Sequence, residues 1–367
     1  MFKAEELFQN VTDKNHPDET VLTIIQGKGT LPREQAGRNI HYDDASLSNY
    51  KKVEQGDFII HLRSFEGGLE MANEAGIVSP AYTILRCKRP HSSLFYDAYF
   101  HTDEFINHNL SKSVEGIRDG RQISYEAFKW LGIPYCEPTE QEKISNLFSI
   151  LNERIAKQRD LVESLKKYKR GVVKAIMTKQ IRFVDKNGKP YPEWLACTLQ
   201  DAVDFLDGQR KPLASADRAK RQGKYPYYGA SGIIDSIDDY IFDEPLILLG
   251  EDGANIINRS SPLCFIATGK YWVNNHAHVM RPHKGQSIRF LCELLESLDY
   301  TRYNTGTAQP KLNQEKCRTI SLSLPIYEEQ CHIADFLAAI EHKYAQENEK
   351  LDGILQTKNA LMQQLFI

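Results

Sequence analysis

One phrase that opens a helix occurs twice in this sequence, 189 residues apart. The segment PTEQEKISNLFSIL covers residues 138–151, and EEQCHIADFLAAI covers residues 328–340. With Gln141 aligned on Gln330, apolar residues in both copies recur at alternating steps of three and four, which places them on one helix face. Each copy continues for about 38–40 residues without an internal proline, or about 55–60 Å of helix. The repeat therefore predicts two equivalent long amphipathic helices.

A long helix with one apolar stripe must bury that stripe, and the nearest partner is its own copy. Polar residues interrupt both stripes at the same steps, Gln158 with Glu347 and Lys169 with Lys358. Two unrelated amphipathic helices would explain the stripes but not the shared interruptions. We therefore expect an antiparallel, pseudo-twofold coiled coil. The residues expected in its seam are Ile144, Phe148, Leu151, Ile155, Val162, Leu165, Ile333, Leu337, Ile340, Tyr344, Leu351 and Ile354.

The segments before the two helices also resemble each other. Residues 57–68 align with 245–256 near the same offset, and residues 78–86 align with 273–281 after a six-residue shift. Short β-like runs bounded by Gly, Pro, Asn and Asp alternate with helical patterns, so each globular half is predicted to be α+β. The clearest β-like runs are residues 21–25, 58–62, 246–249 and 263–268, and the clearest helical run is residues 288–298.

The chain is thus expected to alternate globular and helical parts. A linker rich in Gly and Pro at residues 185–194 separates the first helix from the second globular half. The predicted domains are a first globular domain at 1–133, a first long helix at 134–182, a second globular domain at 183–323 and a second long helix at 324–367.

Composition favours a protein of the cytoplasm. Of the 367 residues, 41% are hydrophobic and 26% are charged, which is ordinary for a soluble globular protein. No run of eighteen apolar residues is present, so no membrane span is expected. The first ten residues lack the apolar core of a signal peptide. The seven cysteines include no C-x-x-C pair, so neither a zinc site nor a disulfide framework is expected.

The net charge of −3 hides basic regions. Residues 140–182 contain eleven Lys and Arg against five Asp and Glu, whereas residues 328–367 contain three against seven. The segment 209–228 carries six basic residues and one acidic residue, with three tyrosines. Such a pattern is typical of nucleic-acid surfaces, because Lys and Arg contact phosphates and Arg can read guanine edges. A solvated loop followed by core tyrosines would give the same pattern.

Two polar loops with glycines stand at equivalent places in the two halves. Residues 303–312 read YNTGTAQPKL, where Gly306 permits a tight backbone, and residues 115–124 read EGIRDGRQIS. Equivalent places favour equivalent use, although a turn that merely starts the next element remains an alternative. The predicted DNA-binding residues are Lys28, Arg33, Arg38, Arg63, Arg118, Arg121, Arg210, Lys211, Arg218, Lys220, Arg221, Lys224, Tyr227, Thr307, Gln309 and Lys311.

The usual catalytic signatures are missing from the sequence. It has no phosphate-binding P-loop, no G-x-S-x-G elbow and no NPPY-type motif of adenine methyltransferases. His276 and His278 could ligate a metal, but a His-x-His pair without a third ligand is more often structural. A nuclease built on Glu251 and Asp252 remains an alternative. The missing signatures together favour a binding protein with no catalytic residues and no metal.

Four segments of the second half resemble, in order, the specificity subunits of type I restriction-modification enzymes. The resemblance covers nearly the whole chain and is weaker over the first 130 residues, as expected if the two halves read different sequences. The first half also lacks a counterpart of residues 191–201 ahead of Phe2, so the natural start lies upstream or the first domain is shorter. The four segments are residues 225–256, 265–280, 305–314 and 324–337.

The resemblance implies an activity for the whole chain. Each globular half would be a target-recognition domain, and the helices would act as a spacer that docks two methyltransferase subunits. The chain would bind double-stranded DNA at a bipartite site and would catalyse nothing itself. The methyltransferase subunits would use S-adenosylmethionine to methylate N6 of a flipped adenine. Restriction subunits, using ATP and Mg²⁺, would cut unmodified DNA in host defence.

The long helices favour the same geometry without the resemblance. Two recognition modules held by a stiff helix pair would have a set separation. Adding a turn to both helices is therefore expected to lengthen the preferred DNA spacer. A coiled-coil scaffold whose globular ends bind proteins is the rival interpretation, and it predicts no DNA affinity that falls steeply with salt.

Overall fold

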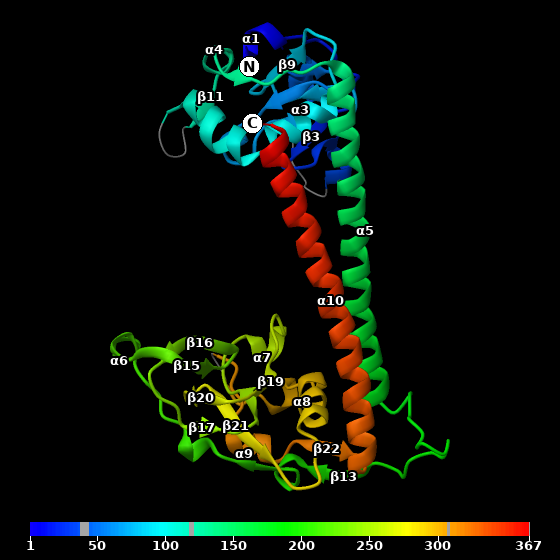
Figure 1. Cartoon of the computed structure of the whole chain (residues 1–367), viewed down its shortest axis with the longest axis vertical. Helices are drawn as coiled ribbons and strands as arrows, with labels where there is room; N and C mark the ends of the chain where they lie inside the picture. The colour runs from blue at the N-terminus through cyan, green and yellow to red at the C-terminus, as the bar shows by residue number, and fades with distance from the viewer. Residues whose placement is uncertain (37–43, 117–120, 307–308, 367) are drawn as a thin grey trace. The chain divides into compact units, whose positions relative to one another are not determined.

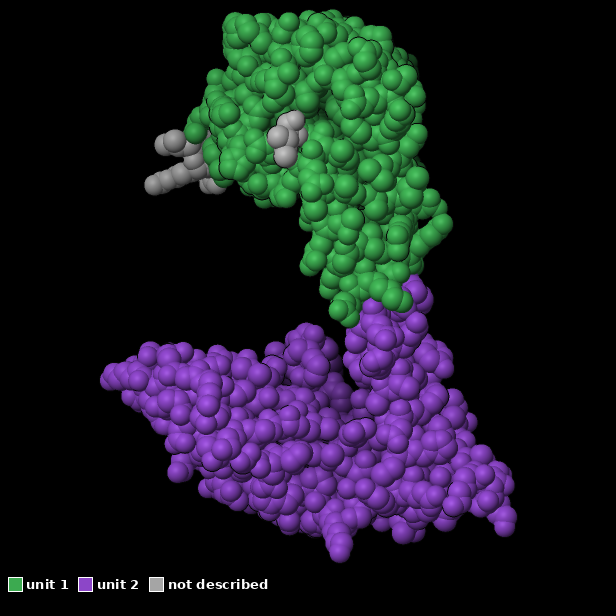
Figure 2. Space-filling view, in the orientation of Figure 1, with its two compact units in different colours: residues 1–160, 348–367 green, residues 161–347 purple. Residues whose placement is uncertain are grey.

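The described residues form two compact units, which Figure 2 draws in different colours. Unit 1 comprises Met1–Asp160 and Asn348–Ile367, and unit 2 comprises Leu161–Glu347. Each unit contains one globular part and a stretch of both long helices. The predicted domains keep each long helix whole, whereas the boundary between the compact units divides both helices. The mixed α+β content is as predicted. The computed structural model describes residues 1–36, 44–116, 121–306 and 309–366.

The long helices begin where the repeated phrase predicts them. Helix α5 spans Pro138–Met177 and helix α10 spans Tyr327–Leu365 (Figure 1). Pro138 suits the first turn of α5 because its fixed φ is helical and the first turn needs no N–H from it. Glu328 and Glu329 place negative charge at the positive end of α10.

The two helices run in opposite directions where they meet in unit 2. Lys169 Nζ of α5 lies 2.8 Å from Glu341 Oε2 of α10. Further along the chain, just beyond α5, the Phe183 ring packs edge-on against Phe336, which is earlier in α10. As residue numbers rise along the first segment, the contacted residue numbers in α10 fall, so the predicted antiparallel pairing is confirmed.

The predicted seam residues lie on the inner side of the helices. In unit 1 the rings of Phe148 and Phe366 stack with centroids 5.9 Å apart. Glu347, expected as a polar interruption, is buried and accepts a 2.7 Å hydrogen bond from Lys343 Nζ. The buried seam residues are Phe148, Ile155, Val162, Ile333 and Leu337, and the half-buried ones are Ile144, Leu151, Leu165, Ile340, Tyr344, Leu351 and Ile354.

A buried glutamine fastens the globular part of unit 2 to its long helix. The Gln330 side chain accepts the backbone N–H of Ser287 at 2.9 Å, at the start of helix α8 (Ile288–Ser297). It donates to the Pro325 carbonyl at 2.9 Å and to Gln286 Oε1 at 2.8 Å. We name this arrangement the Gln330 clasp. It fixes the first turn of α8 against the first turn of α10.

Unit 1 contains the same arrangement around Gln141, which we name the Gln141 clasp. Its side chain accepts the backbone N–H of Ser92 at 3.0 Å, at the start of helix α3 (Ser93–Phe100), and donates to the Cys136 carbonyl at 2.8 Å. Ser92 Oγ adds a 2.7 Å hydrogen bond to Ser145 Oγ of α5. The repeated phrase in the sequence is thus explained by a repeated hydrogen-bonded joint.

Each unit is built on a four-stranded antiparallel sheet with the same order of equivalent strands. In unit 1 Leu85 pairs with Phe58, and in unit 2 Met280 pairs with Ile247. The offset from Leu85 to Met280 is 195 residues and that from Phe58 to Ile247 is 189, which confirms the six-residue shift. The sheets are β2 (Phe8–Val11), β9 (Thr83–Cys87), β6 (Phe58–Ile60) and β7 (Glu70–Met71) in unit 1, and β14 (Val203–Phe205), β21 (Ala277–Pro282), β18 (Leu246–Gly250) and β19 (Cys264–Ala267) in unit 2.

A two-stranded ribbon closes each unit beside its long helix and corrects one expectation. Phe2 pairs with Ile133, and Leu195 pairs with Leu324. Phe2 is therefore the counterpart of Leu195, and the first half does contain an equivalent of that part of residues 191–201. The expectation of a missing counterpart was wrong because the two segments share a pairing position and little sequence. The strands are β1 (Phe2–Lys3), β12 (Gly132–Ile133), β13 (Leu195–Thr198) and β22 (Ser321–Leu324).

Unit 2 carries a second sheet, which holds the basic segment. Its strand order is β16-β15-β20-β17, with β15 parallel to β20. The second sheet packs through Phe242, Tyr271 and Val273 against the buried strands of the first. The strands are β15 (Gln222–Gly229), β16 (Gly232–Ile237), β17 (Phe242–Asp243) and β20 (Lys270–Val273).

Shorter elements complete both units. Among the described residues, no helix is long and apolar enough to cross a membrane. Unit 1 adds β3 (Leu22–Ile25), β4 (Gly29–Pro32), β5 (Lys51–Val53), β8 (Gly76–Val78), β10 (Val114–Glu115), β11 (Gln122–Ile123), α1 (Ala4–Leu7), α2 (Ser64–Gly67) and α4 (Tyr125–Phe128), and unit 2 adds α6 (Ser215–Lys220), α7 (Asn255–Asn258) and α9 (Gln314–Arg318).

Candidate nucleic-acid interface

Four loops of unit 2 meet at one end of its sheets. We name them the loop cluster: residues 229–232, 250–254, 274–276 and 304–312, of which 307–308 lie outside the described residues. Backbone hydrogen bonds join the last three: the Leu312 N–H donates to the Glu251 carbonyl at 2.7 Å, and the Gly253 N–H donates to the Pro310 carbonyl at 3.0 Å. The Glu251 N–H donates to the His276 carbonyl at 2.8 Å. Segments far apart in the sequence therefore share one hydrogen-bonded base.

Glycines permit the close approach of these loops. A Cβ on Gly250 would lie 2.7 Å from the Ala230 carbonyl oxygen, so a larger residue would push the hairpin turn away. A Cβ on Gly306 would collide with the Gln309 carbonyl, so the tight backbone expected at Gly306 is confirmed. Both positions are fixed by sterics within the loop cluster.

A buried histidine lies beneath the loop cluster. His278 of β21 is fully buried, with Nδ1 2.6 Å from Asp207 Oδ2 and Nε2 2.8 Å from the Leu312 carbonyl oxygen. Asp207 Oδ1 accepts the Val279 N–H at 2.8 Å, and Oδ2 accepts Gln314 Nε2 at 3.0 Å. Burial alone would lower the pKa of His278, but the hydrogen bonds and charge interactions with Asp207 and Cys317 together outweigh it and raise the pKa to about 10.

Arg210 belongs to this interior network rather than to the surface. Its Nη1 lies 2.8 Å from Glu251 Oε2 and 2.8 Å from the Ala277 carbonyl oxygen, and its side chain is 14% exposed. Lys311, which is half exposed, approaches Glu251 Oε1 at 3.4 Å from the solvent side. Arg210, predicted as a DNA contact, is therefore paired with a carboxylate at the base of the loops.

The same cluster brings together three groups of the kinds that ligate metals. One ligand atom each from Asp207, Glu251 and His278 lies within 4.8 Å of the others. Both ring nitrogens of His278 already face oxygen acceptors, and each carboxylate already accepts protein hydrogen bonds or ion pairs. A metal would have to displace Arg210 and one acceptor of His278, so the arrangement fits a salt-bridged network better than a metal centre.

Two arginines of the basic segment fasten that segment to the second sheet. Arg218 Nε lies 2.9 Å from Asp235 Oδ2, and its guanidinium lies over the Tyr227 ring at 5.1 Å. Arg221 Nη2 lies 2.9 Å from Asp238 Oδ1 and stacks over Trp272 at 5.1 Å. Their charges are already paired within the chain, as is usual for arginines that stack on aromatic rings.

Tyr227, a second predicted DNA contact, is also engaged within the chain. It is 1% exposed, and its hydroxyl oxygen accepts the Leu213 N–H at 2.9 Å. Tyr227 is therefore a core residue beneath the segment, as in the alternative of core tyrosines. By contrast, Lys211, Lys220 and Lys224 are exposed, and no described carboxylate pairs with them. These lysines, with exposed Gln309 and half-exposed Lys311, are the predicted residues that unit 2 presents to solvent.

In unit 1 the predicted Lys28 stands at the tip of a pinned hairpin. The buried carboxylate of Glu70 accepts the N–H of Gly27 at 2.6 Å and of Gly29 at 2.8 Å, on either side of Lys28. Burial alone would raise the pKa of Glu70, but hydrogen bonds from His101 and these amides outweigh it and hold the pKa below its usual value. The turn between β3 and β4 is thus fixed, and Lys28 is exposed on it.

Arg63 and Arg121 both lie at helix α2 of unit 1. Arg63 Nη2 is 2.6 Å from Glu66, and the Arg121 guanidinium lies 4.2 Å from the Phe65 ring centroid. Arg33 is half-buried, 5.9 Å from the Tyr50 ring centroid. The remaining predicted residues, Arg38, Arg118 and Thr307, lie outside the described residues.

The sequence prediction missed two exposed isoleucines beside the loop cluster. Ile233 and Ile234 of β16 are 59% and 53% exposed. Tyr228 pairs with Ile233 and Tyr227 with Asp235, so Ile234 is an extra residue in its strand, a β-bulge that turns both isoleucines toward solvent. The sequence does show two isoleucines directly after Gly232. It does not show that they are exposed, because the bulge that exposes them depends on strand pairing.

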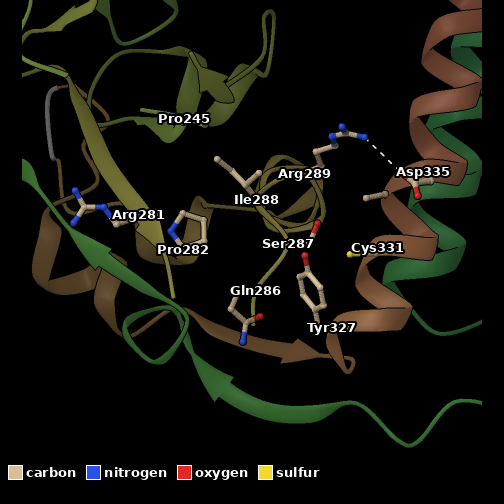
Figure 3. A pocket seen from close by; sticks show the side chains of 11 residues that line it. Pro245, Arg281, Pro282, Gln286, Ser287, Ile288, Arg289, Tyr327, Cys331 and Asp335 are labelled. Atoms are coloured by element: carbon tan, nitrogen blue, oxygen red, sulfur yellow. Dashed lines mark hydrogen bonds and ion pairs between the residues drawn. The ribbon is translucent and has the colours of Figure 1, made fainter. Parts of the chain in front are cut away.

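A cleft of about 470 Å³ opens beside the Gln330 clasp (Figure 3). The ion pair between Arg289 Nη1 and Asp335 Oδ1, 3.4 Å long, crosses its rim. The clasp residues Gln286 and Ser287 form part of its wall, together with Tyr327. The cleft therefore adjoins the joint of α8 and α10, and none of its lining residues belongs to the loop cluster.

Comparisons of sequence identify a matching family model in the second half and two relatives of the chain. Residues 192–356 match the family model described as type I restriction modification DNA specificity domain. A putative type I restriction enzyme specificity subunit from Haemophilus influenzae is 30% identical over 142 residues, covering 39% of this chain and 36% of the relative. The MjaVIII specificity subunit from Methanocaldococcus jannaschii is 25% identical over 203 residues, covering 51% of this chain and 45% of the relative. The chain therefore aligns with less than half the length of either relative.

Solved structures share the fold over the full chain. The S subunit of a type I restriction-modification system from M. genitalium superposes with a TM-score of 0.60 at 14% identity, covering 100% of this chain and 95% of that one. The HsdS subunit from Thermoanaerobacter tengcongensis gives a TM-score of 0.52 at 16% identity, again covering 100% and 95%. At such identities the likeness is one of fold.

Proposed function

We propose that this chain is an HsdS-like specificity subunit of the type I restriction-modification family and that it reads a bipartite DNA sequence for partner methyltransferase subunits. The observation that carries the proposal is the loop cluster, which lies within the matched residues 192–356 and presents Gln309 and Lys311 on a hydrogen-bonded base. The exposed lysines of the basic segment would contact phosphates, which orient a protein on DNA without specifying its sequence.

Unit 1 would read the other half of the site. It repeats the sheet and the clasp of unit 2, but Lys28, Arg63 and Arg121 stand on a hairpin and a helical turn in place of the loop cluster. A bipartite target has two unlike half-sites. Two modules that share a fold but present different surfaces would suit such a target. Base-edge contacts from such surfaces would supply the specificity.

The chemistry would belong to the partners. We propose that two methyltransferase subunits bind the long helices and that S-adenosylmethionine, ATP and Mg²⁺ are bound by the methyltransferase and restriction subunits of the complex. This chain would recognise the DNA sequence and would contribute no reacting group. A working complex would place the system in the cytoplasm, where the DNA is.

Sequencing of the methylated bases in a cell that carries this chain and its methyltransferase tests the proposal. We expect N6-methyladenine in one motif made of two short specified parts with an unspecified spacer. Deleting the gene for this chain, with the methyltransferase retained, should remove the motif. A methylated motif that survives the deletion, or a motif without a spacer, contradicts the proposed function.

Binding of the purified chain to DNA at several salt concentrations separates this function from a protein scaffold. Affinity for a duplex that contains the motif should fall steeply with salt, by about 0.9 in log K per log salt for each phosphate contacted. A scaffold with protein-binding ends should show no specific affinity for the duplex over a scrambled one.

A further inference from the structure

We propose that His278 is a positioning residue that holds the described residues 304–306 and 309–312 of the loop cluster as a doubly protonated ring, clamped between Asp207 and the Leu312 carbonyl. The inference rests on the proposed function only for the claim that this segment contacts DNA. The clamp itself is a property of the folded chain and is tested without DNA.

Hydrogen-bond donors and acceptors fix the protonation of the ring. A backbone carbonyl can only accept, so the 2.8 Å contact with the Leu312 oxygen requires a proton on Nε2. A carboxylate also only accepts, so the 2.6 Å contact with Asp207 Oδ2 requires a proton on Nδ1. A neutral imidazole carries one such proton and would leave one of these contacts as a repulsion between lone pairs.

The alternative is a neutral ring beside a protonated Asp207. Against it, both oxygens of Asp207 accept other donors, the Val279 N–H at 2.8 Å and Gln314 Nε2 at 3.0 Å. Arg210 Nη2 lies 3.5 Å away and also favours the carboxylate. Two donors and a cation around Asp207 stabilise its charged form, so the proton resides on the ring.

The charges around His278 balance when the ring is cationic. The groups that face it are the carboxylates of Asp207 and, at 3.8 Å from Nδ1, Glu251, with the guanidinium of Arg210 and the thiol of Cys317. Two interior carboxylates then meet two interior cations. Lys311, half exposed, is left as an outer partner of Glu251 that can turn toward a phosphate without leaving Glu251 unpaired.

The clamp acts at the base of the segment. Within the segment, the Thr305 N–H donates to the Lys311 carbonyl and Asn304 Oδ1 accepts the Lys311 N–H, both at 2.8 Å, so the loop is braced internally. The described part of the segment is tied to the rest of unit 2 by the two backbone bonds to residues 251 and 253, by the ion pair of Lys311 with Glu251 and by the bond from His278. The bond from His278 is both charge-assisted and buried, and charge-assisted bonds are the stronger kind.

Histidine-selective nitrogen NMR on the full chain tests the protonation. With ¹⁵N-labelled histidine, the eleven histidines should include a signal with both ring nitrogens protonated from pH 6.5 to 9 that vanishes in His278→Gln. His283→Gln is the matched control, since His283 also faces an aspartate and a carbonyl, at 3.2 and 3.0 Å, but at the surface. A neutral His278 ring at pH 7.5 overturns the proposal.

Hydrogen exchange tests the positioning. In His278→Gln the amides of Leu312 and Gly253, which tie the segment to its neighbours, should exchange roughly ten- to a hundredfold faster, the loss expected when a bond to a charged group is removed. His283→Gln should leave both rates unchanged. Unchanged rates in His278→Gln, despite a protonated ring in the wild type, also overturn the proposal.

The methylated motif supplies the functional readout and keeps the two proposals apart. In a cell with His278→Gln, the part of the motif read by unit 2 should lose definition while the part read by unit 1 stays fixed. A motif that keeps both parts overturns the positioning role in DNA recognition. If the wild-type chain directs no adenine methylation, the proposed function fails, and the NMR and exchange results still decide the clamp.

Discussion

At the scale of single residues, partners decide what a basic side chain does. The sequence treats the basic residues of 209–228 alike, but the fold pairs Arg210, Arg218 and Arg221 with carboxylates and leaves the lysines in solvent. Asp207 lies three residues before Arg210, but the other pairing carboxylates come from loops and strands 17 or more residues away, so no local pattern could reveal them. The sequence thus predicts the basic region, and only the fold separates its structural arginines from its exposed lysines.

Neutralising the exposed lysines should weaken DNA binding without loosening the fold. We expect the triple change of Lys211, Lys220 and Lys224 to Gln to lower affinity at low salt and to reduce the salt slope by about 0.9 for each phosphate that the chain no longer neutralises. A triple change of Lys166, Lys167 and Lys174, exposed on α5, is the matched control. Fluorescence anisotropy over a range of salt concentrations gives both quantities, and equal slopes for the two triples would contradict the assignment.

The buried charge of His278 should make stability depend on pH. Its pKa in the folded chain, about 10, lies above the ordinary value of 6.5. Its contribution is therefore complete below about pH 6.5 and is lost as the pH rises toward 10, at no more than about 1.4 kcal/mol per pH unit. Urea unfolding at pH 6.5, 8 and 9.5 should show a steeper decline for the wild type than for His278→Gln. Parallel curves would count against the charged ring.

At the scale of elements, the same joint occurs twice with different surroundings. The sequence revealed the repeated glutamines and the helices that they open, because both features are local and periodic. It did not reveal that each glutamine holds the start of another helix, since Ser92 and Ser287 lie 49 and 43 residues upstream. The short helices α4 and α9 repeat in the same way, each capped by a side chain, Ser124 and Asn313.

Removing a clasp should destabilise one unit in particular. In Gln330→Leu the Ser287 N–H and the Pro325 carbonyl lose their buried partner, which should cost about 2–4 kcal/mol. Gln346→Leu, at an exposed position of the same helix, should cost little. Hydrogen exchange should show faster opening at the start of α8 in the first variant only. Equal exchange in the two variants would mean that the clasp is dispensable.

At the scale of the whole molecule, the sequence did not predict where the compact units divide. Unit 1 is built from two separate stretches of the chain, and both long helices are shared between the two units. The periodic stripe along α5 reads as one element, yet Phe148 belongs to the core of unit 1 and Ile176 to the core of unit 2. Periodicity shows that a helix face is buried, but it does not show which core receives each turn. The α+β class, the long helices and the shared strand register were predictable because they recur within one chain.

Cavities in the two cores should act on different units. Leu337→Ala, in the core of unit 2, and Phe148→Ala, in that of unit 1, should each lower stability by about 2–5 kcal/mol. Hydrogen exchange should then accelerate mainly in the unit that holds the cavity. If each change accelerated exchange in both units to the same extent, the two units would unfold together and not separately.

The split of unit 1 between the two ends of the chain has a consequence for synthesis on the ribosome. Phe366, which packs on Phe95 and Phe148, is translated only after the whole of Leu161–Glu347 has been translated. At ordinary rates of elongation this delay is roughly 10–40 s, during which the first part of α5 lacks the C-terminal part of α10 that covers it in unit 1. The later half of the message can therefore complete its core before the earlier half does, and the nascent chain must keep an apolar helix face out of aggregates while it waits.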